Sequence, residues 1–371
     1  MIKYIGSKRT LIPVILDVIK SIPDVHTVVD LFSGTSRVGH ALKAAGYRVL
    51  SNDHNTYAAT LARCYVQADA EDVLEDAVRL VQELNRLKGS PGYFTETFCL
   101  KSRFFHPKNG ERVDAIREAI LQKGLEPELE AVILTSLMEA ADRVDSTTGL
   151  QMAYLKNWAP RAHNDLKLRV PGILPRAREG KGMAYNLDVF DALSVFEGDL
   201  AYLDPPYNQH SYLSNYHIWE SLILWDKPEV YGVACKRVDI RQRKSVFNSR
   251  PQFAAAMKRL LENVRAPVQI VSFNNEGYLT RDTMEQMISH LYDRKARMTV
   301  IENDFKRYVG AQIGIYNPQG LKVGKISHVR NKEFLYIASK DDSTSRLVLR
   351  QEERGLARQL FLFEAGQEAT P

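Results

Sequence analysis

The chain has 371 residues, of which 44% are hydrophobic and 26% are charged, and its formal net charge is +5. This length suits one large or two ordinary domains, and the composition excludes a disordered chain and a fibrous repeat. The small positive charge permits a polyanionic partner without requiring one. The 3 cysteines are scattered, with no CxxC pair and no nearby pair of histidines. This argues against a disulfide framework or a zinc site, and no apolar run reaches the length of a signal peptide or membrane span, so we expect a reducing cytoplasm.

The first 53 residues have the pattern of a βαβ unit. Apolar spacing predicts a helix over Thr10–Ser21, and a β-branched run predicts a strand over His26–Phe32. A turn of small residues then leads into a predicted helix over Val38–Gly46 and a second strand over Tyr47–Asp53. Because parallel strands need a crossover helix between them, this order predicts a βαβ unit.

The pattern then changes to helices and later returns to strands. Helices are expected over residues 56–67, 71–87, 113–122 and 127–142, with a loop over 89–109. Strands are expected over residues 183–187, 200–203, 268–273, 298–301 and 334–338. We therefore predict an α/β fold with one sheet formed by residues 1–60 and 183–340. A mostly helical insertion over 61–182 interrupts this sheet, and residues 341–371 form a peripheral tail.

Polar residues follow both strands of the βαβ unit. In open α/β sheets, ligands bind outside the carboxyl ends of the strands, so Asp30, the turn Phe32–Thr35 and Asp53 should converge on one crevice. Gly34 lets the backbone approach a ligand, and the Asp53 carboxylate can accept both ribose hydroxyls. The GxGxxG pattern of a dinucleotide site is missing, which favours an adenosine ligand without phosphates, namely S-adenosylmethionine. An ordinary strand-to-helix turn is the alternative.

The N-terminal segment Lys3–Lys8 (KYIGSK) lacks the preceding strand and the second glycine that a phosphate loop requires. We interpret it as a basic lid at the methionine end of the cofactor, where Lys8 reaches a carboxylate. A solvated N-terminal arm is the alternative. Farther along, Asp188 ends another strand and is expected to accept a hydrogen bond from the adenine amino group. Asp191 is its rival, and a helix N-cap is the alternative role for either residue.

Four residues after a predicted strand carry the reaction chemistry: Asp204, Pro205, Pro206 and Tyr207 (DPPY). The exocyclic amino group of a nucleobase is a poor nucleophile, because its lone pair is delocalised into the ring. Asp204 and the Pro205 carbonyl can accept hydrogen bonds that free this lone pair, and the two prolines hold the carbonyl in place. Tyr207 offers a flat face on which an extruded base stacks. A proline-rich turn with a packed tyrosine is the alternative.

A basic run over Lys236–Arg250 follows and contains one acid. Phosphate binding is a natural role for such a run, and a solvated surface loop is the alternative. Tyr212 and Tyr216 suit either a base pocket or helix packing. Sequence readout is expected from the insertion and from the basic stretch Arg161–Lys181. The residues expected to bind DNA are Lys236, Arg237, Arg241, Arg243 and Lys244.

Together these motifs resemble the amino-directed DNA methyltransferases, specifically the adenine-specific, Dam-like (D12 class) family of bacterial restriction–modification systems. KYIGSK resembles the family's N-terminal cofactor motif, DLFSGT (Asp30–Thr35) its glycine motif, SND (Ser51–Asp53) its ribose-binding acid, and DPPY its catalytic signature. The resemblance extends through VSFNNEGYL (Val271–Leu279) and FKRYVG (Phe305–Gly310). The chain departs from the family at Ser36, where a second glycine is usual; a serine is small enough for the turn and able to cap the following helix.

The resemblance implies a Rossmann-like S-adenosylmethionine-dependent methyltransferase sheet with a target-recognition insertion. It implies methyl transfer to the amino group of adenine in duplex DNA after base flipping, with a cognate restriction endonuclease as partner, at the nucleoid of a bacterial cytoplasm. Asp204, Pro205, Pro206 and Tyr207 are then the catalytic residues, and no metal is expected. The residues implied in cofactor binding are Tyr4, Gly6, Lys8, Asp30, Phe32, Ser33, Gly34, Thr35, Asp53, Asp188 and Asp204.

Other functions stay open. The same reaction on cytosine would be favoured by a serine in place of Asp204. A protein-glutamine methyltransferase typically has asparagine at that position, and an RNA methyltransferase is a further alternative. A non-catalytic DNA-specificity subunit is the rival from another class, and the intact KYIGSK, DLFSGT and DPPY motifs argue against it.

Overall fold

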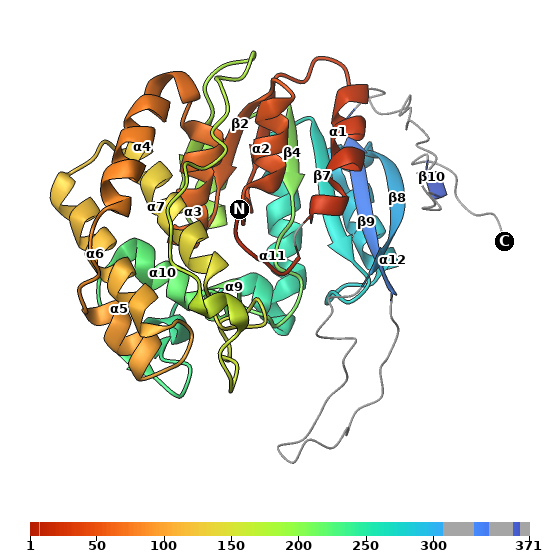
Figure 1. Cartoon of the computed structure of the whole chain (residues 1–371). Helices are drawn as coiled ribbons and strands as arrows, with labels where there is room; N and C mark the ends of the chain where they lie inside the picture. Colours follow the sequence, from red (N-terminus) through yellow and green to blue (C-terminus); the bar gives the residue numbers. More distant parts are fainter. Residues whose placement is uncertain (7, 307–329, 341–358, 364–371) are drawn as a thin grey trace. The chain divides into compact units, whose positions relative to one another are not determined.

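The computed structural model describes residues 1–6, 8–306, 330–340 and 359–363 (Figure 1). The chain divides into two compact units. Unit 1 comprises Met1–Ile12, His26–Phe196 and His210–Ser245. Unit 2 comprises Pro13–Val25, Glu197–Gln209 and Val246–Pro371.

The sheet of unit 1 consists of parallel strands in the order β1-β2-β3. They are β1 (Thr27–Asp30), β2 (Arg48–Asn52) and β3 (Met183–Tyr185). Helix α2 (Arg37–Ala44) connects β1 to β2, which confirms the predicted βαβ unit. Val28 and Val29 of β1 are buried, as expected for a strand covered on both faces.

Helices make up most of the rest of unit 1. The α-helices are α3 (Thr56–Ala62), α4 (Ala70–Asn85), α5 (Tyr93–Thr95), α6 (Pro107–Lys123), α7 (Pro127–Arg143), α8 (Val189–Val195), α9 (Tyr212–Asn215) and α10 (His217–Leu224). π-Helical turns η2 (Arg63–Gln67) and η3 (Glu96–Leu100) extend α3 and α5, and η1 (Lys8–Thr10), η4 (Pro160–His163) and η5 (Val238–Arg241) are 3-10 turns. The short strands β5 (Val230–Tyr231) and β6 (Lys236–Arg237) form an antiparallel pair.

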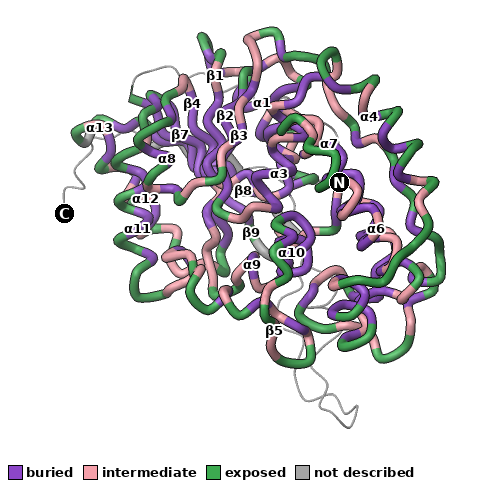
Figure 2. The backbone as a smooth tube through the Cα atoms, turned by 90° about the vertical axis from the view of Figure 1, so that its left-hand side faces the viewer, coloured by how far each residue is buried: buried purple, intermediate pink, exposed green. Residues whose placement is uncertain are grey.

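Helix α7 lies at the centre of the helical part of unit 1. Its residues Ile133, Leu137 and Met138 are fully buried, and most of its other positions are buried too. A helix that is apolar on nearly all sides is stable only when neighbours surround it. Helices α3, α4 and α6 supply these neighbours, and α4 presents an exposed edge to solvent (Figure 2).

The sheet of unit 2 has the strand order β4-β7-β9-β8-β10. Strand β4 (Leu200–Leu203) runs parallel to β7 (Val268–Asn274), and β9 (Arg330–Ser339) is antiparallel to both β7 and β8 (Arg297–Lys306). Strand β10 (Gln359–Phe363) is antiparallel to β8. The helical segments of this unit are α1 (Ile12–Ser21), which begins on the last residue of a unit 1 segment, η6 (Val246–Asn248), α11 (Arg250–Asn263), α12 (Arg281–Ser289) and α13 (Leu291–Arg294).

The predicted α/β, Rossmann-like class is confirmed, and the predicted helices and strands are found. The predicted loop over residues 89–109 is wrong in part, because α5 and η3 form there. They form because Phe94 and Phe98 pack into the core of unit 1. Helix α6 begins six residues before the predicted Val113, with Pro107 in its first turn and His106 as its N-cap.

Some predictions concern domain boundaries, and others concern residues outside the described part. Unit 1 contains strands β1, β2 and β3 together with the helices within residues 61–182. The domain boundaries at 60, 182 and 340 stay predictions. Ser7 of KYIGSK, residues 307–310 of FKRYVG and most of the predicted tail lie outside the described residues; residues 359–363 of that tail form β10.

In the part of the chain that the structure describes, no helix is both long and apolar enough to cross a membrane. No group of three or more His, Cys, Asp or Glu side chains among those residues is placed to hold a metal ion.

Candidate cofactor and catalytic sites

The turn after β1 is attached to the end of β2. The backbone N–H of Ser33 donates to the Asn52 carbonyl at 2.9 Å, and that of Gly34 donates to Asp53 Oδ2 at 2.9 Å. Gly34 has a φ of +51°, a left-handed conformation that glycine adopts at little cost. The structure thus brings together the glycine turn and the acid that the sequence predicted to converge.

The Asp53 carboxylate is already engaged by backbone and side-chain donors. Its Oδ1 accepts from the backbone N–H of Asn55 at 2.9 Å and from Asn55 Nδ2 at 3.1 Å. Burial raises the pKa of Asp53, and the hydrogen bonds from Asn55 and Gly34 act in the opposite direction. A carboxylate has about four acceptor sites, so about one is left for a ligand hydroxyl.

Ser33 supplies a test of whether the turn fits a polar ligand. Its Oγ is buried and has no hydrogen-bond partner among the described residues. A buried hydroxyl without a partner costs about 1–3 kcal/mol, which a ligand that bonds to it would offset. Together with Gly34 and Asp53, this hydroxyl makes the turn suitable for the polar groups of an adenosine moiety.

The other candidates in this turn are mostly buried. Asp30 is 1% exposed, and a Cβ at Gly39 of α2 would lie 3.6 Å from its Oδ2. Thr35 is buried and Phe32 is half-buried. Their contacts with a cofactor stay predictions.

The predicted helix-capping role of Ser36 is wrong. Ser36 has a φ of 58°, and its side chain makes no capping hydrogen bond to α2. An N-cap side chain reaches the first turn from an extended backbone, whereas a left-handed residue directs it elsewhere. Ser36 instead keeps the turn closed through its backbone N–H, which donates to the Ser33 carbonyl at 2.7 Å.

The N-terminal arm, of which residues 1–6 and 8 are described, is anchored by a cluster of tyrosines. The Tyr4 ring stacks on Tyr216 with a centroid distance of 4.5 Å and on Tyr212 with a distance of 5.1 Å. The Tyr4 hydroxyl lies 3.2 Å from the hydroxyl of Tyr57, and burial raises the pKa of both phenols. A Cβ at Gly34 would lie 3.5 Å from Tyr4 Cε1, so the Tyr4 ring lies against the turn of residues 32–35, the candidate cofactor turn.

Backbone and charged contacts hold the same arm. The Ile5 N–H donates to the Tyr216 hydroxyl at 2.6 Å, and Lys3 Nζ donates to Asp145 Oδ1 at 2.7 Å. The Lys3 N–H donates to Asp142 Oδ2 at 3.1 Å. Burial raises the pKa of Asp142 to about 6, and the nearby Lys3 charge acts against this shift. The alternative of a solvated arm is therefore wrong, at least for the described residues.

The structure also gives the positions of three further residues named in the predictions. Tyr216 is 1% exposed, so helix packing accounts for it better than a base pocket. Lys8 is 7% exposed, and its contact with a cofactor carboxylate stays a prediction. Gly6 has a φ of +71°, and a Cβ there would lie 2.9 Å from the Tyr212 hydroxyl oxygen. Because of this φ and this close approach, glycine suits the position best, which explains the glycine of KYIGSK.

Sequence reasoning missed two residues that shape this site. Asn52 Oδ1 accepts from the Leu187 N–H at 3.0 Å, which joins the end of β2 to the segment after β3. Glu220 is fully buried in α10 and accepts from the N–H groups of Thr56 (3.2 Å) and Tyr57 (3.0 Å) at the start of α3. A single acid inside the apolar run HIWESLIL was the signal that could have identified Glu220.

Asp188 lies at the exposed start of α8. Its Oδ1 accepts from the Phe190 N–H at 2.9 Å, so the predicted alternative of an N-cap is present. Asp191 lies in the first turn of the same helix. The contact of either residue with adenine stays a prediction.

The DPPY residues of unit 2 follow β4 directly, at its carboxyl end. The Tyr207 carbonyl accepts from the Tyr278 N–H at 3.0 Å, and the Tyr207 ring makes a T-shaped contact with Phe273 at 5.5 Å. The carbonyl of the next residue, Asn208, accepts from Asn248 Nδ2 at 2.8 Å. Contacts with β7, with Tyr278 after it and with Asn248 of η6 thus hold the DPPY loop, and Tyr207 remains half-exposed.

The basic run after DPPY is used partly inside unit 1. The Arg237 side chain is 3% exposed and pairs with Asp226 at 2.7 Å and Asp239 at 2.9 Å. Arg243 pairs with the buried Glu220 at 2.6 Å. The Arg237 guanidinium is therefore engaged within unit 1, and its contact with DNA stays a prediction.

The remaining residues of this run are more accessible. Arg241 and Lys244 are exposed, and Arg241 lies over the Tyr231 ring at 4.4 Å. Lys236 is half-buried, with its Nζ 3.2 Å from Ser214 Oγ, and burial lowers its pKa. Contacts of these residues with DNA stay predictions.

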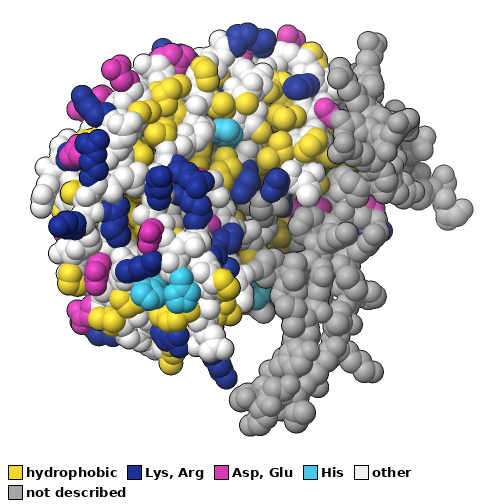
Figure 3. Space-filling model, viewed as in Figure 1, with side chains coloured by type: hydrophobic (Ala, Val, Ile, Leu, Met, Phe, Trp, Pro, Cys, Tyr) yellow, Lys and Arg dark blue, Asp and Glu magenta, His cyan; other side chains and the backbone are white. Residues whose placement is uncertain are grey.

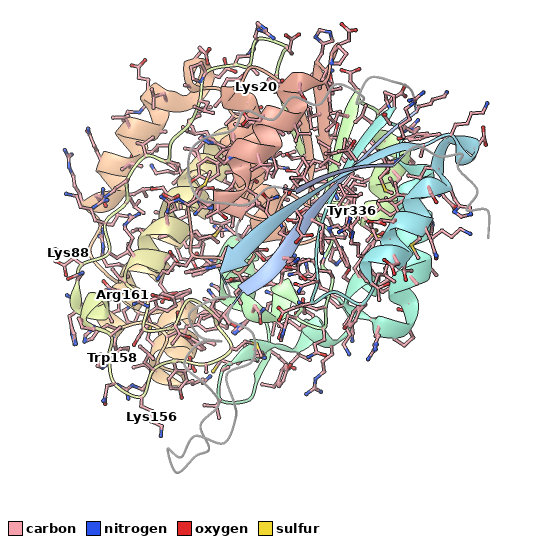
Figure 4. The ribbon with its side chains drawn as sticks, turned by 90° about the vertical axis from the view of Figure 1, so that its right-hand side faces the viewer. Lys20, Lys88, Lys156, Trp158, Arg161 and Tyr336 are labelled. Atoms are coloured by element: carbon pink, nitrogen blue, oxygen red, sulfur yellow. The ribbon has the colours of Figure 1, made fainter. Side chains whose placement is uncertain are left out.

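Charges of the basic stretch Arg161–Lys181 also have acidic neighbours. Arg161 pairs with Asp145 at 2.7 Å and Lys181 with Glu128 at 2.9 Å. Figure 4 shows Arg161 near Trp158 and Lys156, on the segment between α7 and β3. Lys156 is exposed, and the Arg103 guanidinium lies over the Trp158 ring at 4.7 Å.

Three features define the class of amino-directed methyltransferases. They are a glycine turn bonded to a strand-terminal acid, an arm packed on that turn, and a DPPY loop at the end of a parallel strand. The chain matches the family model described as D12 class N6 adenine-specific DNA methyltransferase over residues 4–286. The chain belongs to this family.

Named relatives agree with this assignment. The chain is 31% identical over 304 residues to the type II methyltransferase M.FokI of Planomicrobium okeanokoites, covering 77% of this chain and 46% of that protein. It is 28% identical over 306 residues to the modification methylase StsI of Streptococcus sanguinis, covering 77% and 46%. It is 26% identical over 314 residues to the type II methyltransferase M.NlaIII of Neisseria lactamica, covering 82% and 90%. The chain thus spans about half the length of the first two relatives and nine-tenths of the third.

Proposed function

We propose that the protein transfers a methyl group from S-adenosylmethionine to the exocyclic N6 amino group of adenine in a specific duplex DNA sequence, after base flipping. The observation that carries this proposal is the DPPY loop at the carboxyl end of β4, anchored through Tyr207 and Asn208 in a chain of the D12 class family. Methyltransferases of this kind use S-adenosylmethionine, which supplies an electrophilic methyl group on sulfonium.

The side chains of unit 1 that would hold this cofactor are those of the cofactor turn and the arm. Asp53 would accept from a ribose hydroxyl with its remaining acceptor site, and the Ser33 hydroxyl would bond to a polar group of the ligand. Tyr4 would cover the ligand from the arm, because its ring already lies against Gly34.

The DPPY residues would act on the target base. The Asp204 carboxylate and the Pro205 carbonyl would accept hydrogen bonds from the amino group, which draws its nitrogen toward tetrahedral geometry and frees the lone pair. As the new N–C bond forms, the S–C bond of the sulfonium would break and leave a neutral thioether. The proton lost by the amino group would pass to the Asp204 carboxylate. Tyr207 would stack on the flipped base.

A labelled-methyl experiment tests the reaction and the target atom. The full chain is incubated with labelled S-adenosylmethionine and unmethylated genomic DNA, and modified bases are then mapped by modification-sensitive sequencing. We expect N6-methyladenine in one short sequence. Methylcytosine, or no label in DNA, would overturn the proposal.

Two aspartate variants test the site. Asp204→Ala is expected to abolish transfer while the protein remains folded, as circular dichroism measures. Asp76→Ala on α4, where the Asp76 side chain is half-exposed and pairs with Arg79, serves as the matched control and should retain full activity. Full activity of Asp204→Ala would show that the catalytic site is misplaced.

We further propose that this methylation protects DNA from a restriction endonuclease of the same specificity, in the bacterial cytoplasm where that DNA lies. The names of the relatives, which include type II methyltransferases and modification methylases, support this context. The test is whether plasmid DNA from cells that express the protein resists a nuclease that cleaves the mapped sequence. Cleavage at the unmodified rate would refute the protective role.

A further inference from the structure

A separate cavity in unit 1 lies outside the cofactor turn. Its volume is about 480 Å³, and one face of α2, the end of α7 and residues 169–172 line it. None of the residues predicted to hold the cofactor is among its described lining residues. The polar lining residues are Arg37, His40, Tyr65, Glu139, Arg143 and Arg169.

Positive charge exceeds negative charge in this lining. Three guanidinium groups face one carboxylate, that of Glu139, which also accepts hydrogen bonds from the Met1 nitrogen and the Tyr65 hydroxyl. Arg37 Nε is buried and has no hydrogen-bond partner among the described residues. A buried charged donor without a partner is costly, so this nitrogen is poised to bind an acceptor.

Burial and mutual repulsion act on these arginines. Burial lowers the pKa of Arg37, and the charge of Arg9 lowers it further. Burial likewise lowers the pKa of Arg143, and the neighbouring Arg169 adds to this effect. Both arginines stay charged at neutral pH, and an anion bound beside them would offset the repulsion that Arg37 feels from Arg9 and Arg143 from Arg169.

Hydrogen bonds fix the wall that carries Arg169. His40 Nε2 lies 2.9 Å from the Gly172 carbonyl, and burial lowers the pKa of His40, so the neutral ring donates through Nε2. Ser136 Oγ donates to the Arg169 carbonyl at 2.6 Å, and Arg143 Nη2 donates to the Lys167 carbonyl at 2.7 Å. The cavity is therefore built before any ligand arrives.

We propose that this cavity binds a phosphate group. Guanidinium groups bind phosphate through paired N–H donors, and the charge surplus of the lining matches a phosphate better than a monovalent carboxylate. The volume lies within the range of small-ligand sites. In Figure 3, Lys and Arg side chains gather over the region of α7, one of the elements that line the cavity, and they add positive potential there. A DNA backbone phosphate and a free phosphate share this chemistry, and the experiment separates them.

The first measurement uses inorganic phosphate and the full chain. The thermal unfolding midpoint of the wild type should rise by several degrees in phosphate relative to chloride at equal ionic strength. Arg37→Gln and Arg143→Gln should lose at least half of this rise. Arg79→Gln, which removes an arginine from the exposed face of α4, should retain it.

The second measurement uses duplex DNA. If a backbone phosphate occupies the cavity, the slope of log K against log salt should fall by about one in each cavity variant and stay unchanged in Arg79→Gln. If the slope stays unchanged while the phosphate rise is lost, the occupant is a free phosphate. Both outcomes support the site.

The proposal is overturned if the cavity variants and the wild type gain equally in phosphate and bind DNA with equal slopes. Where circular dichroism shows that a glutamine variant does not fold, Arg169→Glu takes its place, because Arg169 is exposed. Arg79→Glu is then the control with the same change of charge. The Asp204→Ala protein should keep the phosphate response, so this proposal and the proposed methylation can fail separately.

Discussion

The hydroxyl of Tyr216 offers the cleanest test of how the N-terminal arm supports the cofactor turn. This hydroxyl accepts from the Ile5 N–H at 2.6 Å, and the Tyr216 ring stacks on Tyr4 at 4.5 Å. Tyr216→Phe removes the acceptor and keeps the ring. The variant therefore isolates one hydrogen bond between the arm and α10, whose first residue follows Tyr216.

The expected magnitude follows from the burial of the two partners. An N–H left without a partner costs about 1–3 kcal/mol when it is fully buried. Ile5 is only half-buried, so water can reach part of its backbone and the lower limit of about 1 kcal/mol applies. If the arm must be seated for the cofactor to bind, this loss corresponds to an affinity lower by about fivefold.

Two assays separate a local from a general effect. Urea unfolding reports the free energy of unfolding, and calorimetric titration with S-adenosylmethionine reports the affinity. Tyr93→Phe is the matched control, because it also removes one tyrosine hydrogen bond in unit 1, the 2.8 Å bond to the Pro228 carbonyl. We expect both variants to lose stability and only Tyr216→Phe to lose affinity. Equal affinities of Tyr216→Phe and the wild type would refute the role of the arm in cofactor binding.

Three further predictions concern stability. Gly6→Ala should lower the free energy of unfolding by about 1–2 kcal/mol because of its left-handed φ of +71°, and further because its Cβ would contact the Tyr212 hydroxyl. Adding Tyr212→Phe should recover the loss due to that contact in urea titrations, and no recovery would refute the contact. Leu137→Ala in α7 should cost about 2–5 kcal/mol, and a urea-measured loss below about 1 kcal/mol would show that the core repacks. Burial lowers the pKa of His217 from 6.5 to about 3. The neutral His217 ring therefore contributes stability above pH 6.5 that is lost as the pH falls toward 3, by up to about 1.4 kcal/mol per pH unit. His217→Gln should flatten the pH dependence of the urea midpoint.

The strands and helices were predictable wherever local periodicity and burial agree. The βαβ unit follows from β-branched runs and a small-residue turn, and all of these form within about 25 residues of one another. The helical turns at residues 93–100 were not predictable from periodicity, because Phe94 and Phe98 lie in a segment flanked by glycine and proline. Their burial against other parts of unit 1 decides the local structure there.

The site was predictable in so far as topology determines it. Gly34 and Asp53 had to converge, because parallel strands place their carboxyl ends at one edge. The contacts that hold the N-terminal arm were not predictable, because Tyr216, which accepts from the Ile5 N–H, lies 211 residues from Ile5 along the chain. Glu220 likewise serves a helix that begins 164 residues earlier. Local patterns do not contain such distant pairs.

The basic run shows why charge along a sequence is weak evidence for DNA contact. Asp226 and Asp239 are outnumbered by the basic residues near them in the sequence, yet both pair with the buried Arg237. Arg117 gives a second example, since its guanidinium is buried and donates to the carbonyls of Leu222 and Ile223 near the end of α10, where a cation also offsets the helix dipole. Both guanidinium groups are engaged within unit 1, so a count of positive residues along the sequence overstates the charge that is accessible. The charge that remains available lies on exposed side chains such as Arg241 and Lys244 and in the arginine-lined cavity. The salt dependence of DNA binding should therefore change in Arg241→Gln and Lys244→Gln but not through the charge of Arg237, whose replacement should lower stability instead.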